Sequence, residues 1–196
     1  MKNAKNKIYR LTLLGILTAI IIIQNFVPFL GNIPIPPLNP TIIQITVIVA
    51  AFVLGTKDGI IIGGIWGIVR LIKAYTLPTT PLDFLLFTNP LISILPRLLI
   101  GLTAGLVFQY FHKRNKDQIG MVVGAVVGSL TNTVFVLGFI ALLYGGEYSA
   151  ALGVAPSGLM AALGVVVATN GVAEAIASAI LAPIFSRVLI KVKRKS

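Results

Sequence analysis

The chain has 196 residues, of which 57% are hydrophobic and 11% charged, with 16 Lys and Arg against 5 Asp and Glu. A soluble domain of this length cannot bury so much apolar surface, so the composition predicts one integral-membrane domain over residues 1–196. The absence of cysteine excludes disulfides and thiolate metal sites. The net charge of +11 needs no nucleic-acid partner, because its placement follows the rule for cytoplasmic loops and suits a lipid bilayer.

Most of the basic residues lie in four short segments that alternate with loops containing none. The basic segments are 1–10, Lys57, 112–118 and 187–196, and the uncharged or acidic loops are 31–40, 78–90 and 145–157. Loops rich in Lys and Arg stay on the cytoplasmic side of a membrane. The pattern therefore predicts an all-α membrane protein, a compact bundle of six transmembrane helices in the cell membrane with cytoplasmic N- and C-termini.

We expect the six spans at residues 11–30, 41–55, 60–77, 91–111, 119–144 and 170–190. The start of the chain has the basic and apolar parts of a signal peptide. However, its apolar run is about long enough to span, and no cleavage site of small residues follows. The stretch 145–190 is too long for one loop and one span, so we expect a short helix near 157–168, lying in the outer interface.

Small residues recur at four-residue spacing, which lets helices in lipid approach closely. The members of these stripes are Gly59, Gly63, Gly67, Gly101, Gly105, Gly120, Gly124 and Gly128. Gly15 and Ala19 form a similar pair near the cytoplasmic end of the first helix. The stripes are typical of packing inside the bundle, whereas the pair on the first helix is placed where a partner membrane protein could dock.

Polar side chains from spans of opposite direction are expected at one level of the membrane. Counting about 1.5 Å per residue along each helix places them at or above the midplane, on the outer side. They are Gln24, Asn25, Arg70, Lys73, Arg97, Asn132, Asn170 and Glu174, with Tyr75 nearby. Charges inside a membrane are costly and usually functional. Three cations and one carboxylate predict a positive cavity for a small ligand that carries a carboxylate, with amide and phenol groups for its other polar atoms.

Each of these side chains also has a structural interpretation. Long stems let Lys73 and Arg97 reach the outer headgroups, although Arg70 lies too deep for that. Glu174 would then only neutralise a cation, and Asn132 would only bond a neighbouring helix. Two aromatic residues fit packing or interface roles, Trp66 and Tyr75.

Catalytic signatures are missing from the sequence. There is no G-x-x-x-x-G-K-[ST] phosphate loop, no H-E-x-x-H metal motif and no pair of carboxylates at catalytic spacing. The single histidine, His112, lies beside Lys113 in a basic loop and is expected to be solvated. We therefore predict a non-enzyme without metal or cofactor, in which any ATP hydrolysis belongs to partner subunits.

Several segments carry a resemblance that covers the whole chain. The segments are LGTKDGIIIGGIWGIVRLIKA (54–74), LPRLLIGLTAGLVF (95–108) and NGVAEAI (170–176), with the Gly15/Ala19 pair. With them, the chain resembles the substrate-binding S component of energy-coupling factor (ECF) vitamin transporters, and is most similar to the pantothenate-specific members.

The resemblance implies a high-affinity vitamin-binding subunit that works with a transmembrane coupling protein and two ATP-binding cassette subunits. Such a subunit captures the vitamin from outside and topples in the membrane to release it. Gly15 and Ala19 become the docking face for the coupling protein, with Gly at position 15 as a departure from the more usual Ala.

Within this interpretation Arg97 is the first choice for the vitamin carboxylate, because it lies near the outer mouth and can grip a carboxylate with two hydrogen bonds. Arg70 or Lys73 would assist, Asn132 would orient polar groups, and the loops 31–40 and 78–90 would close as lids. The alternatives are an S component for hydroxymethylpyrimidine or another vitamin, an autonomous secondary transporter, and a small intramembrane enzyme. No internal inverted repeat supports the second of these.

Overall fold

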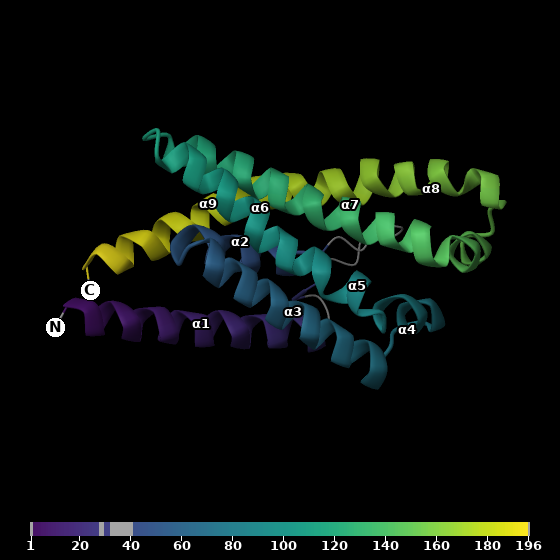
Figure 1. The fold of residues 1–196 in the computed structure, drawn as a ribbon, viewed down its shortest axis with the longest axis horizontal. Helices are drawn as coiled ribbons and strands as arrows, with labels where there is room; N and C mark the ends of the chain where they lie inside the picture. Colours follow the sequence, from purple (N-terminus) through teal and green to yellow (C-terminus); the bar gives the residue numbers. More distant parts are fainter. Residues whose placement is uncertain (1, 28–29, 32–40, 196) are drawn as a thin grey trace.

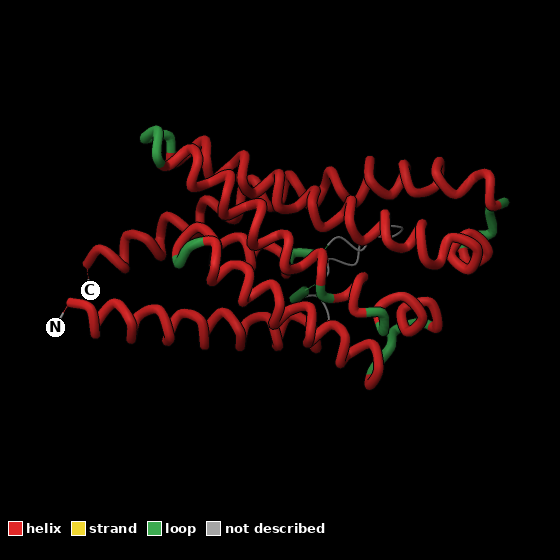
Figure 2. The backbone as a smooth tube through the Cα atoms, viewed as in Figure 1, coloured by secondary structure: helices red, strands yellow, loops and turns green. Residues whose placement is uncertain are grey.

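The structure is a computed structural model that describes residues 2–27, 30–31 and 41–195. Within these residues every regular element is helical, which confirms the all-α prediction (Figures 1 and 2). The elements are α1 (Lys2–Phe26), α2 (Ile43–Val53), α3 (Thr56–Thr76), α4 (Pro81–Phe87), α5 (Pro90–Ser93), α6 (Leu95–His112), α7 (Asp117–Ala151), a 3₁₀ turn (Pro156–Gly158), α8 (Leu159–Val166), a π-helical turn (Val167–Gly171) and α9 (Val172–Lys195).

In the described part of the chain, five helical segments are long and apolar enough to cross a membrane. They are Lys7–Phe26, Thr56–Thr76, Pro90–His112, Asp117–Ala151 and Pro156–Lys193. The sixth apolar helix, α2, has only 11 residues, a length of about 16 Å against a hydrocarbon core of about 30 Å. A sixth span therefore stays a prediction. Most of the proline-rich loop expected as a lid, residues 32–40, lies outside the described residues.

The short helix α2 forms the centre of the bundle. All of its residues are buried, and it contacts α1, α3, α6, α7 and α9. Apart from Gln44 and Thr46, α2 is apolar on every side, and such a helix belongs in a core because it has no polar face to present to a polar surface. The outer parts of the neighbouring helices carry exposed apolar side chains, as expected of a surface that faces lipid.

Close approach between α3 and α6 depends on the predicted glycine stripes. A side chain at Gly63 would collide with the backbone of Arg97, and one at Gly101 would collide with the backbone of Gly59. The missing side chains let the two helices pack backbone to backbone. This contact fixes the first turn of α6, and with it Arg97, against the inner face of α3.

The stretch 145–171 differs from the prediction. Helix α7 continues to Ala151 with a kink at Tyr144, so that most of the predicted loop 145–157 is helical. The helix near 157–168 exists, but it runs through the π-helical turn directly into α9 and is not a separate element. The prediction of a break was wrong because no proline interrupts residues 157–182, so nothing ends the helix there.

The basic segments share one end of the bundle. The chain begins and ends there, next to the turn between α2 and α3 and the loop between α6 and α7, on the left of Figure 1. Helices α4, α5 and α8 lie at the opposite end. The polar residues predicted to converge belong to the half of the bundle nearer α4.

Candidate functional site

A cavity of about 490 Å³ lies between the helices, and side chains of α4 form part of its lining. Its volume is in the range of pockets that hold small molecules. The lining combines charged, amide and apolar side chains, among which those used below are Gln24, Asn25, Thr41, Trp66, Arg70, Lys73, Thr79, Asp83, Phe87, Arg97, Asn132, Asn170 and Glu174. The cavity lining thus includes residues of the first helix, α1, the last helix, α9, and the long helices α3, α6 and α7 between them.

Eight of the nine predicted binding residues line this cavity. They are Gln24, Asn25, Arg70, Lys73, Arg97, Asn132, Asn170 and Glu174. The ninth, Tyr75, does not: its side chain is exposed, and its hydroxyl lies 3.5 Å from the backbone oxygen of Thr88. Tyr75 occupies the side of α3 that faces away from Trp66 and the bundle core. The structure brings the other eight together, and their role in binding stays a prediction.

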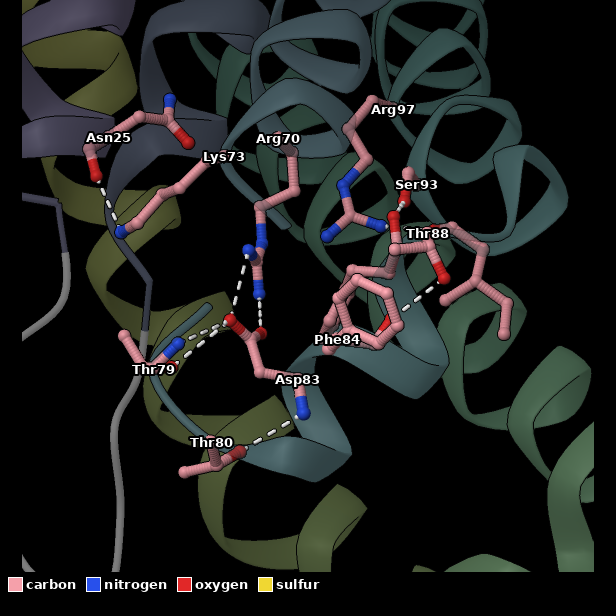
Figure 3. A network of polar contacts seen from close by, with 12 residues as sticks. Asn25, Arg70, Lys73, Thr79, Thr80, Asp83, Phe84, Thr88, Ser93 and Arg97 are labelled. Carbon is pink, nitrogen blue, oxygen red and sulfur yellow. Dashed lines mark hydrogen bonds and ion pairs between the residues drawn. The ribbon is translucent and has the colours of Figure 1, made fainter. Parts of the chain in front are cut away.

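Arg70 already has a carboxylate partner, Asp83 of α4, with which it forms an ion pair (Figure 3). The same carboxylate accepts hydrogen bonds from the backbone N–H and the hydroxyl of Thr79, at 3.0 and 3.1 Å. The Arg70 guanidinium also lies 4.0 Å from the centre of the Phe87 ring. Arg70 therefore ties α4 to α3 and is not a free cation for a ligand.

Asp83 is held in place by the start of α4. Thr80 is the N-cap residue, and its hydroxyl oxygen accepts a hydrogen bond from the Asp83 backbone N–H at 3.0 Å. Burial raises the pKa of the Asp83 carboxyl, but the hydrogen bonds from Arg70 and Thr79 outweigh it and keep that pKa below its usual value. The carboxylate is therefore ionised at neutral pH.

Lys73 contacts the first helix. Its ammonium nitrogen lies 2.6 Å from the backbone oxygen of Asn25 (Figure 3). The Asn25 side chain, which is buried, donates to the backbone oxygen of Ile21 at 2.8 Å. Lys73, which was predicted with Arg70 to assist in binding the carboxylate, thus already holds the end of α1.

Arg97 is a buried cation with unused hydrogen-bonding capacity. It is 5% exposed, donates one N–H to the backbone oxygen of Ile92, and has no carboxylate in ion-pair contact among the described residues. Its Nε has no hydrogen-bond partner in the described part of the chain. The guanidinium lies over the Trp66 ring at 5.0 Å and near the Phe87 ring at 5.5 Å. A buried charge without a counterion is costly, which favours an anion beside it.

Trp66 was predicted only as a packing or interface aromatic. It is 2% exposed and lines the cavity, and its indole Nε1 has no hydrogen-bond partner among the described residues. A buried indole N–H usually has a partner. The wall beside Arg97 therefore presents a second unused donor to a bound molecule.

Glu174 and Asn170 come from the far side of the cavity. Glu174 is 8% exposed and accepts a hydrogen bond from the backbone N–H of Thr41 at 2.8 Å. Asn170 lies in the π-helical turn before α9, and its Oδ1 has no partner within the described chain. Such turns are rare and frequently mark functional sites. Gln24, on α1, accepts from the hydroxyl of Thr46 at 3.1 Å.

Asn132 of α7 faces the cavity from a second polar network. Its Nδ2 lies 3.4 Å from Oε1 of Gln44, and its Oδ1 has no partner among the described residues. The cavity wall thus offers unused donors at Trp66 and Arg97 and unused acceptors at Asn132 and Asn170. This set suits a molecule with an acidic group at one place and hydroxyl or amide donors at another.

Sequence reasoning missed Asp83, which changes the charge of the site. Asp83 stands in a loop expected only as a lid, 13 residues from Arg70, and helical spacing does not connect the two. The signal that could have found it is the motif Thr80-Pro81-Leu82-Asp83, typical of a helix start with an acidic third residue. A short helix there turns Asp83 back toward α3.

The predicted docking pair lies on the outside of the bundle. Gly15 and Ala19 are both exposed, and a side chain built at Gly15 would meet no atom within 4 Å. Gly63 and Gly101, in contrast, are buried against backbone of a neighbouring helix. The small residues of α1 therefore do not serve packing within the described chain.

A family match and two relatives of known name cover most or nearly all of the chain. Residues 9–186 match the family described as "ECF transporter, substrate-specific component". The pantothenate transporter PanT of Leuconostoc mesenteroides is 31% identical over 98% of this chain and 98% of its own length. The pantothenic acid transporter PanT of Lactococcus lactis subsp. cremoris is 30% identical over 98% of this chain and 99% of its own.

Proposed function

The chain belongs to the family of ECF transporter substrate-specific components, and on that premise we propose that it is the pantothenate-binding subunit of an importer. The two named relatives support the choice of ligand. Each is named as a transporter of pantothenate, and the similarity to each covers nearly the full length of both chains. The family resemblance also makes the subunit a transport protein and not an enzyme.

The choice of an anionic ligand rests on Arg97, which is buried without a carboxylate in ion-pair contact among the described residues. Three cations and two carboxylates line the cavity, which leaves one positive charge in excess. Arg70 is paired with Asp83, and the Lys73 ammonium is bonded to α1. Arg97 is buried and has no carboxylate in ion-pair contact among the described residues, so a ligand carboxylate there would supply a counterion through charge-assisted hydrogen bonds.

Pantothenate carries groups that can bond the unpartnered polar atoms of the cavity wall. Its single carboxylate complements Arg97, with the Trp66 N–H as an additional donor. Its two hydroxyl groups and amide N–H can donate to the free oxygens of Asn132 and Asn170. A neutral heterocycle would leave Arg97 without a counterion, which makes it the poorer ligand.

We propose further that the bundle has six spans, with both termini in the cytoplasm and the cavity opening outward. The gathering of the basic segments at one end of the bundle, opposite α4, supports this orientation. Import would require a transmembrane coupling protein that docks on Gly15 and Ala19, and two ATPase subunits. The exposure of both residues, with open space at Gly15, supports that role.

Calorimetry of the purified chain with pantothenate tests the ligand. The wild-type chain should bind pantothenate, and Arg97→Ala should lose about 2–5 kcal/mol of binding free energy, as when one partner of a buried charge pair is removed. Arg97→Lys should recover only part of it, since an ammonium lacks the two-pronged geometry. Arg114→Ala is the matched control, because that exposed cation follows the far end of α6, is absent from the cavity lining and lies over the Tyr110 ring. Unchanged binding by a folded Arg97→Ala protein would refute the carboxylate role.

A further inference from the structure

A fully buried glutamine stands behind the cavity wall. Gln44, in the first turn of α2, is 0% exposed and does not line the cavity. It lies in a helix whose other members are apolar, apart from Thr46. A primary amide buried in this way is costly unless all its hydrogen bonds are made. Its presence in the centre of the bundle therefore calls for a reason beyond packing.

The hydrogen bonds of Gln44 connect three helices. Its Nε2 donates to the hydroxyl oxygens of Ser129 on α7 and Ser178 on α9, at 2.8 and 3.3 Å. Its Oε1 accepts from Nδ2 of Asn132 at 3.4 Å. With Nε2 of Gln44 directed toward Ser129 and Ser178, its Oε1 is left to accept from Asn132.

The orientation of Gln44 decides the orientation of Asn132. An amide side chain can present either its NH₂ group or its oxygen, and its neighbours select between them. Since Oε1 of Gln44 takes the NH₂ group of Asn132, the Asn132 oxygen remains on the cavity side. That oxygen is buried and has no partner within the described residues. The cavity wall at this point is therefore an acceptor.

We propose that Gln44 is a positioning residue that fixes Asn132 as a hydrogen-bond acceptor and so selects ligands that carry a hydroxyl or amide N–H donor. The inference rests on the proposed function, in which the ligand carboxylate is bound at Arg97. A ligand with only an acceptor at this position would leave two buried oxygens facing each other. A site built to bond a donor rejects analogues that lack it far more strongly than an apolar pocket rejects an extra group.

The test compares pantothenate with three analogues. Two lack one hydroxyl each, replaced by hydrogen, and in the third the amide nitrogen is methylated. We expect the wild-type chain to bind at least one of them about 100-fold more weakly than pantothenate, and that analogue identifies the donor that meets Asn132. Calorimetry on the full chain measures all four affinities.

Gln44→Met keeps the length of the side chain but removes its hydrogen bonds. We expect this variant to bind pantothenate about 10-fold more weakly, while its affinity for the discriminated analogue stays near the wild-type value. The ratio between the two ligands should therefore fall about 10-fold. Ser129→Ala, a smaller change that removes one acceptor of Gln44, should lower the ratio in the same direction by a smaller factor and protects the test against misfolding of the first variant.

The outcomes separate this inference from the proposed function. Arg97→Ala should weaken pantothenate and its analogues by the same factor, because it acts on the carboxylate that they share. If the Gln44→Met and Ser129→Ala proteins also weaken all ligands equally, Gln44 only supports the fold and the inference is wrong. The same holds if the wild-type chain does not discriminate among the four ligands. If the wild-type chain does not bind pantothenate, the proposed function fails and this inference fails with it.

Discussion

The ammonium nitrogen of Lys73 lies 2.6 Å from the backbone oxygen of Asn25, in the last turn of α1. The last carbonyl groups of a helix have no partner within it, and a cation there also complements the helix dipole. Near the other end of α1, Arg10 forms two hydrogen bonds with Asp58 of α3, at 2.6 and 2.7 Å. Helix α1 is thus fixed to α3 at both ends, and one of the fixing groups lines the cavity.

Replacing Lys73 with Met should release the end of α1 that lies near the cavity. We expect a loss of about 1 kcal/mol of stability, less than for a fully buried charged hydrogen bond because Lys73 is partly exposed. A spin label on a cysteine at Phe26 should become more mobile in this variant, while one at Leu17 should not. The chain has no cysteine of its own, so each label reports one site. Lys57→Met, at an exposed turn, is the control, and equal mobility at Phe26 in both variants would contradict the role of Lys73.

The ion pair between Arg70 and Asp83 should hold α4 over the cavity. Asp83→Asn leaves the Arg70 guanidinium without its counterion and close to two other cations. We expect a loss of about 2–3 kcal/mol of stability, below the range for fully buried pairs because Arg70 is partly exposed. Pantothenate should also dissociate faster. Thermal unfolding and stopped-flow release of the ligand measure the two effects, and an unchanged release rate would show that α4 is not a lid.

The pH dependence of this pair follows from the lowered pKa of Asp83. A carboxyl whose pKa is lower in the folded state contributes its full stability above the usual aspartate value of about 3.9 and loses it as the pH falls through the folded value. The stability difference between wild type and Asp83→Asn should therefore be constant from pH 5 to 8. It should shrink below about pH 4. A difference that already declines between pH 7 and 5 would mean that another group titrates.

The convergence of polar residues could be predicted because height along a helix follows directly from residue number. Arg70, Arg97 and Glu174 lie on helices whose alternating direction was predicted from the basic segments, so their levels could be compared without any tertiary contact. Which of them are paired could not be predicted. Asp83 reaches Arg70 through the short helix α4, whose direction depends on packing against α3 and α7.

Two further features could not be predicted from the sequence: the role of Gln44 and the course of the chain after Tyr144. Gln44 stands in the apolar run predicted as the second span, and only the packing of α2 against α7 and α9 reveals its partners. The continuation of α7 to Ala151 is not evident from the sequence, because Gly145 and Gly146 have low helix propensity. In the structure Leu159 packs beside Gly145, and this contact compensates for the low helix propensity of glycine.

The face of α1 that carries Gly15 and Ala19 should serve a partner and not ligand binding. Gly15→Trp should abolish pantothenate uptake by cells that contain the full importer, while calorimetry on the purified chain should give near wild-type affinity. The reason is that open space surrounds Gly15 in the chain itself, so that a large side chain blocks only an approaching helix.

Two other glycines provide matched controls for this substitution. Gly164 on α8 is exposed and has equally open surroundings, so Gly164→Trp should preserve both uptake and binding. Gly63 is buried against the backbone of Arg97, so Gly63→Trp should fail to fold. If Gly15→Trp transported normally, or if Gly164→Trp failed in the same way, the docking role would have to be abandoned.

The orientation of the bundle can be tested with single cysteines in the otherwise cysteine-free chain. Lys113 lies in the basic loop between α6 and α7, and Ser157 lies in the turn before α8 at the opposite end. Both side chains are exposed, so differences in labelling report the side of the membrane and not burial.

A membrane-impermeant thiol reagent added to intact cells should label Ser157→Cys and spare Lys113→Cys until the membrane is permeabilised. The expectation rests on the retention of Lys- and Arg-rich loops in the cytoplasm. Labelling of Lys113→Cys in intact cells would place the basic end outside and would turn the cavity toward the cytoplasm, which is incompatible with capture of an external vitamin.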